Sequence, residues 1–238
     1  MSEWAVKRFW TDVTVVEEVG LFGVRLDGRA VRTPAKAPLN VPTAAFADEI
    51  AAEWRAQEGV IRPDTMPATR AANAAIDKIA PQRAEVAQML AAYGETDLLC
   101  HRADAPEALT RVQAEAWDPL LDWAHETYGA RLMPTAGIVP VAQSPEALAR
   151  LTAPVLALSP FALAPFHDLV ALTGSLVMGL AAGRHAAAPE DLWTASRLDE
   201  SWQADQWGHD EEAAATAEIK REAFLNAAKF FDLVGESV

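Results

Sequence analysis

The spacing of apolar residues changes once along this chain, and the two parts predict different structures. Near the start, β-branched residues gather at 13–19, and two further strand-like runs, 21–26 and 29–33, flank Asp27-Gly28, a dipeptide typical of a tight hairpin loop. A helix is expected next, because Phe46, Ile50 and Trp54 recur at four-residue steps and therefore share one helix face. This apolar face needs a cover, and the hairpin sheet is the nearest candidate.

Further along, the sequence predicts helices almost throughout. Pro81 and Pro189 each suit the first turn of a helix, and residues 108–127 carry apolar side chains at three- and four-residue steps. The predicted fold class is therefore α+β. We expect a small N-terminal α+β domain at 1–66, in which one helix covers a β-hairpin sheet, and a larger all-helical domain at 67–238.

Residues 151–183 are strongly apolar, which raises the question of a membrane span. Three prolines and a His-Asp pair interrupt the first half of this segment. The uninterrupted remainder, 169–183, has about 15 residues, whereas a membrane-spanning helix needs roughly 20. We therefore expect a buried central helix and no membrane insertion. Ser175, Gly179 and Gly183 leave one face of this helix nearly bare, so a neighbouring helix can pack closely there.

The chain is strongly acidic. It has 20 Lys and Arg residues against 34 Asp and Glu residues, which gives a formal net charge of −14 at pH 7. Most of the acidic excess lies in the C-terminal helices. Nucleic acid is not expected as a partner, since phosphate binding needs a concentrated basic face. The single cysteine, Cys100, excludes an internal disulfide, and its apolar neighbours predict a buried, unreactive thiol.

No sequence motif predicts an enzyme active site. The phosphate-binding loops of nucleotide enzymes and the nucleophile elbow of hydrolases are absent, and no two histidines have the spacing that places them on one helix face. We therefore predict no catalytic residue, no cofactor and no metal. Neighbouring carboxylates such as Asp199 and Glu200 remain candidates for acid–base chemistry, but they also suit the solvated face of an acidic helix.

Tryptophans and carboxylates occur together near the C-terminus. The group comprises Arg197, Asp199, Glu200, Trp202 and Trp207, and Trp202 shares a helix face with the leucine four residues before it. The two tryptophans suit a role as core anchors. The same mixture also suits a protein-binding face, where aromatic side chains anchor a partner and charges steer its approach.

Eight strings, in order along nearly the whole chain, resemble the F1-ATPase assembly chaperones that act on the free α subunit (the ATP-twelve-type chaperones). They are Lys7-Arg8-Phe9-Trp10, Val24-Arg25-Leu26-Asp27-Gly28-Arg29, Val31-Arg32-Thr33-Pro34, Ala52-Glu53-Trp54, Thr65-Met66-Pro67, Asp97-Leu98-Leu99-Cys100, Gln113 with Trp117-Asp118-Pro119-Leu120, and Arg197-Leu198-Asp199-Glu200 with Trp202-Gln203 and Trp207-Gly208. An ordered set of this kind is far more specific than a single motif.

The resemblance implies a non-catalytic chaperone with a small N-terminal α+β domain and a helical C-terminal domain. Its implied activity is to bind the unassembled α subunit of F1 and keep it soluble until β subunits arrive. A ring subunit has large apolar interfaces that invite wrong pairing before assembly, so such a chaperone is physically sensible. The first residues show neither a secretory signal nor a transit peptide, which predicts a bacterial, cytoplasmic member of the family. We expect it to be a monomer.

The resemblance also places a functionally important acidic residue directly after Arg-Leu, which corresponds to Asp199 or, one residue on, to Glu200. We therefore predict that Asp199 and Glu200, with Arg197, Trp202 and Trp207, bind the partner. The alternative from a different class is a small helical enzyme that uses Asp199 and Glu200 as a carboxylate pair in a cleft. A closed pocket with convergent polar groups would favour the enzyme, and an open acidic-aromatic groove would favour the chaperone.

Overall fold

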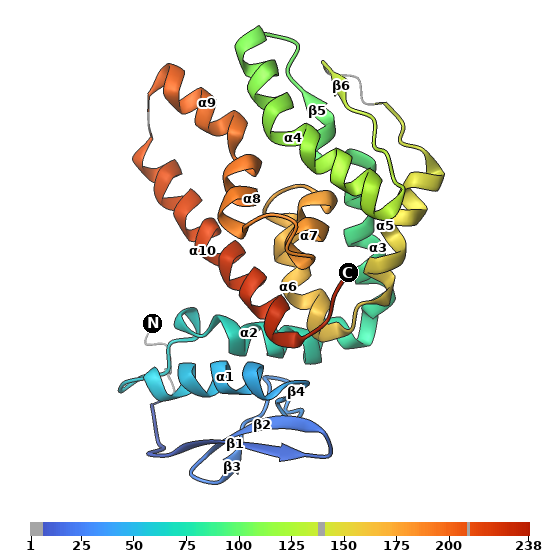
Figure 1. Cartoon of the computed structure of the whole chain (residues 1–238). Helices are drawn as coiled ribbons and strands as arrows, with labels where there is room; N and C mark the ends of the chain where they lie inside the picture. The colour runs from blue at the N-terminus through green and yellow to red at the C-terminus, as the bar shows by residue number, and fades with distance from the viewer. Residues whose placement is uncertain (1–6, 138–140, 209) are drawn as a thin grey trace. The chain divides into compact units, whose positions relative to one another are not determined.

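The computed structural model describes residues 7–137, 141–208 and 210–238 of the chain (Figure 1). These residues group into two compact units. The first contains the described residues up to Arg83, together with Ser159–Pro165 and Lys229–Glu236, and the second contains Ala84–Leu158, Phe166–Ala228 and Ser237–Val238. The predicted division into domains at 1–66 and 67–238 stays a prediction.

The first unit contains an antiparallel sheet of four strands: β1 (Val13–Glu18), β2 (Leu21–Leu26), β3 (Arg29–Ala30) and β4 (Asn40–Val41). Strand β2 pairs with all three others. The hairpin predicted at Asp27-Gly28 is confirmed, because both residues have positive φ, 47° and 78°, as a tight hairpin turn requires. The third strand is shorter than the predicted run of 29–33, since Pro34 and the chain that follows it turn away to reach β4.

Helix α1 (Ala44–Ala56) covers one face of this sheet, as predicted (Figure 1). Thr43 caps its N-terminus by accepting a hydrogen bond from the backbone N–H of Phe46. Phe46 and Ile50 are buried on the predicted stripe, and the ring of Trp54 meets Trp10 edge-on with centroids 5.1 Å apart.

The C-terminal turn of α1 also fixes the start of helix α2 (Pro67–Ala74). The Glu53 carboxylate accepts hydrogen bonds from the backbone N–H of Thr69 at 2.8 Å and from its hydroxyl at 2.6 Å. Burial raises the pKa of Glu53, and these hydrogen bonds oppose the shift. A π-helical turn at Ala75–Ile79 and 3₁₀ turns at Pro63–Thr65 and Ala80–Gln82 complete this stretch.

The second unit is almost entirely helical, which confirms the predicted fold class. Its elements include α3 (Arg83–Ala91), α4 (Glu107–Tyr128), α5 (Pro145–Ala157), α6 (Pro160–Ala171), α7 (Leu176–Gly183), α8 (Pro189–Ser196), α9 (Leu198–Trp207) and α10 (Glu211–Val234), with 3₁₀ turns at Ala92–Thr96 and Leu98–Cys100. Two short strands, β5 (His101–Arg102) and β6 (Thr135–Ala136), pair in parallel. The first residue of α3, the first six of α6 and the last turns of α10 belong to the first unit.

Every residue of α7 is buried, so this helix forms the centre of the second unit. The close packing predicted at the small residues is confirmed at Gly179, where an added Cβ would lie only 2.5 Å from a methyl group of Val170. The expected single buried helix is instead two helices, α6 and α7. The chain breaks between them because Gly174 adopts a positive φ of 71° and Ser175 caps α7 through the N–H of Met178. Among the described residues, no helix has the length and apolar character that crossing a membrane requires.

Candidate functional site

Helix α9 is unusual because none of its side chains is buried. The same holds for residues 211–222, the first turns of α10. Both segments lie at the periphery of the second unit in Figure 1. Trp207 on α9 and Ile219 on α10 are 81% and 69% exposed. Short helices normally gain most of their stability from packing, so this surface is suited to being covered by another molecule.

A groove of about 480 Å³ runs between α4, α8 and α9. Each helix contributes one stripe of side chains at three- and four-residue spacing, as the geometry of an α-helix requires. The stripes are Val112 and Ala116 on α4, Asp191, Thr194 and Ala195 on α8, and Leu198, Ser201, Trp202 and Asp205 on α9. The groove is open and mostly apolar, with carboxylates contributed by α8 and α9.

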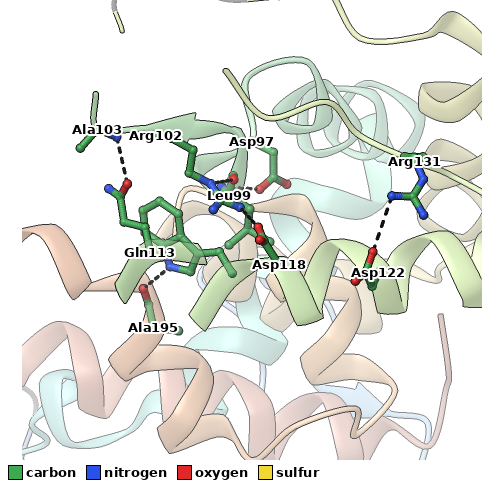
Figure 2. A network of polar contacts seen from close by, with 10 residues as sticks. Asp97, Leu99, Arg102, Ala103, Gln113, Asp118, Asp122, Arg131 and Ala195 are labelled. Carbon is green, nitrogen blue, oxygen red and sulfur yellow. Dashed lines mark hydrogen bonds and ion pairs between the residues drawn. The ribbon is translucent and has the colours of Figure 1, made fainter. Parts of the chain in front are cut away.

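A buried tryptophan holds α4 and α8 together beneath this groove. Trp117 is fully buried, and its indole N–H donates a 2.8 Å hydrogen bond to the carbonyl oxygen of Ala195. The guanidinium of Arg102 lies over the Trp117 ring at 5.3 Å from its centroid. Arg102 also donates to the Leu99 carbonyl at 2.7 Å and pairs with Asp118 at 2.7 Å (Figure 2). The hydrogen bond from Trp117 to Ala195 therefore fixes the spacing between α4 and α8.

Asp199 lies against α4. Its Oδ1 atom accepts a 2.7 Å hydrogen bond from Nε2 of Gln113, which is only 1% exposed. The Gln113 oxygen in turn accepts from the backbone N–H of Ala103 at 2.9 Å, a contact that Figure 2 shows. Both ends of the buried Gln113 amide are thus satisfied, and Asp199 fixes the start of α9 relative to α4.

The other predicted partner-binding residues point in different directions. Glu200 forms an ion pair with Arg197, whose guanidinium lies 5.7 Å from the centroid of the Trp193 ring. Trp202 lines the groove next to Leu198, as their shared helix face predicts. Trp207 follows Leu198 by about two and a half turns, so it lies on the opposite face of α9. The structure therefore places one of the five predicted residues in the groove lining.

Sequence reasoning did not single out Asp191 and Asp205 as site residues. Their signal was weak, because carboxylates on the exposed face of an amphipathic helix are common in any acidic protein. It also assigned Val112 and Ala116 to the apolar stripe of a helix, with no indication that this part of the stripe borders a groove.

The described residues contain no group of three or more His, Cys, Asp or Glu side chains that could hold a metal ion. Asp199 and Glu200 engage different partners, Gln113 and Arg197, and neither lines the groove. The groove has mostly apolar walls, with carboxylates from α8 and α9, and it is open to solvent.

Cys100 is predicted to be unreactive in the native protein. Burial, with a smaller contribution from the neighbouring Asp97 charge, raises the pKa of its thiol to about 12, and the thiolate is the reactive form. We expect iodoacetamide at about pH 8 to leave the folded protein unmodified and to alkylate it fully in denaturant, as measured by mass spectrometry. Rapid labelling of the folded protein would contradict this burial.

The chain matches the model of the ATP12 chaperone protein family over residues 7–125. It belongs to that family. Its sequence is 26% identical, over 220 residues, to the mitochondrial protein atp12 of Schizosaccharomyces pombe, an alignment that covers 87% of this chain and 75% of that protein. The protein is thus an ATP12-family chaperone of ATP synthase assembly, as the resemblance of its sequence strings indicates.

Solved structures of bacterial proteins are similar over nearly the whole chain. Atp12 from Paracoccus denitrificans is 50% identical with a TM-score of 0.94, and the match covers 98% of this chain and 100% of that one. A lysine-for-aspartate variant of the same protein gives a TM-score of 0.95 at the same identity and coverage. The Atu1473 protein from Agrobacterium tumefaciens is 40% identical with a TM-score of 0.91, over 95% of this chain and 85% of that chain.

Proposed function

We propose that this chaperone binds the unassembled α subunit of the F1 sector and keeps it soluble until it pairs with β. We further propose that it acts as a monomer in the bacterial cytoplasm, without a cofactor and without catalysis. The similarity to proteins of Paracoccus and Agrobacterium supports a bacterial setting. The observation that carries the proposal is the helix α9, which has no buried side chain and borders an open apolar groove.

The proposed contact surface comprises Arg197, Asp199, Glu200, Trp202 and Trp207. Trp202 would contribute an apolar wall, and Trp207 is free to bury its exposed ring on a partner. The carboxylates of α9 favour a basic surface on α, and charges of this kind mainly raise the rate of association. Because the ion pair between Arg197 and Glu200 is partly exposed, it can rearrange at little cost when a partner arrives.

The proposal is tested by co-expressing α with and without the chaperone, followed by size exclusion. We expect α alone to aggregate, and α with the chaperone to elute as a soluble complex of the two. Adding β should then release the chaperone and move α into larger assemblies. If α stays insoluble when the chaperone is abundant and folded, the chaperone does not act on free α and the proposal is wrong.

A further inference from the structure

We propose that the groove between α4, α8 and α9 binds a short partner segment that combines apolar side chains with arginine or lysine, and that Asp191 and Asp205 select the basic residues. The inference rests on the proposed function only in assigning the segment to the captured subunit. The chemistry of the occupant follows from the groove itself.

The apolar side chains that line the groove favour an apolar occupant. Val112 and Ala116 on α4 face Leu198 and Trp202 on α9, and Ala195 of α8 lies with them in the lining. The volume of about 480 Å³ is within the range of typical binding pockets, roughly 300–1,000 Å³. Covering these side chains would remove their apolar surface from water, which favours binding by an apolar group that fits.

The carboxylates in the lining favour an occupant with positively charged side chains. Asp191 comes from α8 and Asp205 from α9, and neither forms an ion pair or a side-chain hydrogen bond with any described residue. Asp199 and Glu200 differ in this respect, because Gln113 and Arg197 already engage them. The carboxylates available to an incoming basic side chain in the groove are therefore Asp191 and Asp205. Pairs of this kind fix orientation and reject partners of the wrong charge.

Charge disfavours a second copy of this chain as the occupant of the groove. With a net charge of −14, two copies repel each other, and the groove adds its own carboxylates to that repulsion. An acidic partner would meet the same repulsion.

Two walls of the groove are held in place before a partner binds, since the hydrogen bond from Trp117 to Ala195 fixes the distance between α4 and α8. A fixed groove avoids the cost of ordering on binding.

The experiment uses the full chain and three fluorescein-labelled peptides, with binding followed by fluorescence anisotropy at low salt. The first peptide has two leucines flanked by arginines. The second replaces the arginines with glutamates, and the third replaces the leucines with serines. We expect the first peptide to bind at least about tenfold more tightly than either of the others, since it alone meets both requirements of the groove.

The double variant Asp191→Asn with Asp205→Asn should weaken binding of the first peptide at least about tenfold. The matched control, Asp104→Asn with Glu126→Gln, removes two exposed carboxylates that do not line the groove and should keep parental affinity. A third variant, Ala116→Trp, fills the groove and should also abolish binding. Circular dichroism confirms that each variant is folded.

Equal affinity of the two double variants for the first peptide would overturn the proposal, and so would equal binding of the leucine and serine peptides. Capture of the α subunit is measured separately on the parent protein. If the parent fails to capture α while the peptide results hold, the proposed function fails and the chemistry of the groove stands. If the parent captures α while the peptides bind all variants alike, the groove proposal fails alone.

Discussion

Replacing Trp117 by alanine is expected to destabilise the protein by about 3–5 kcal/mol, the usual range for removing a large buried aromatic side chain. Trp117 is fully buried, its indole N–H donates to Ala195, and Arg102 packs over its ring. The substitution leaves a cavity and an unpaired carbonyl oxygen between α4 and α8, which form two walls of the groove. Unfolding in urea, followed by tryptophan fluorescence and circular dichroism, measures the loss.

The control for this prediction is Trp117→Phe. Phenylalanine fills most of the space but donates no hydrogen bond, so the loss should be smaller, with about 1 kcal/mol of it due to the missing hydrogen bond. The difference between the two variants separates ring packing from hydrogen bonding. An alanine variant that unfolds within about 1 kcal/mol of the parent would show that Trp117 does not anchor α4 to α8.

Local sequence patterns were sufficient to predict the hairpin and the buried face of the first helix. Asp27-Gly28 predicted a tight turn because few other dipeptides accept positive φ at both positions, and the structure has this turn. The stripe of Phe46 and Ile50 predicted which face of α1 is buried, since only one face of a helix can meet a sheet. Both features depend on residues close together in the chain.

The break between α8 and α9 was not predicted. The sequence predicts a helix that starts at Pro189 and indicates no break near Ser196, because neither glycine nor proline occurs in residues 190–207. In the structure, α8 ends at Ser196, whose hydroxyl donates a 2.7 Å hydrogen bond to the carbonyl of Trp193. Arg197 then leaves helical geometry, with φ −105° and ψ 14°. Serine side chains compete with the backbone for hydrogen bonds, but the sequence alone does not show where this competition ends a helix.

The candidate site was predictable only in part. The shared face of Leu198 and Trp202 follows from their spacing, and both residues line the groove. The partner of Asp199 could not be predicted, because Gln113 lies 86 residues away in the chain. The groove itself depends on how three helices approach one another, and local periodicity carries no information about such distances.

Replacing Asp199 by lysine is expected to abolish capture of free α while leaving the chaperone folded. The buried Nε2 of Gln113 would lose its acceptor and face an ammonium group, and a lost hydrogen bond to a charged group costs about 1.5–3 kcal/mol. The substitution destabilises the position of α9, which has no buried side chain, so the core of the second unit should remain folded. Gln113 occupies only Oδ1 of Asp199, so in the proposed complex this carboxylate also pairs with a basic group of α. Removing one member of a desolvated charge pair typically costs about 2–5 kcal/mol of affinity.

The companion variant Asp199→Asn separates two roles of this residue. Asparagine keeps an oxygen that can accept from Gln113 but carries no charge, so it preserves the position of α9 and removes only the electrostatic contribution. We expect Asp199→Asn to capture α more weakly than the parent and more strongly than Asp199→Lys, with a smaller effect of salt on its association rate. Parental affinity of Asp199→Lys for α at low salt would contradict both roles. The α9 surface would then not be the binding site, and the exposed faces of the first unit would be the next to test.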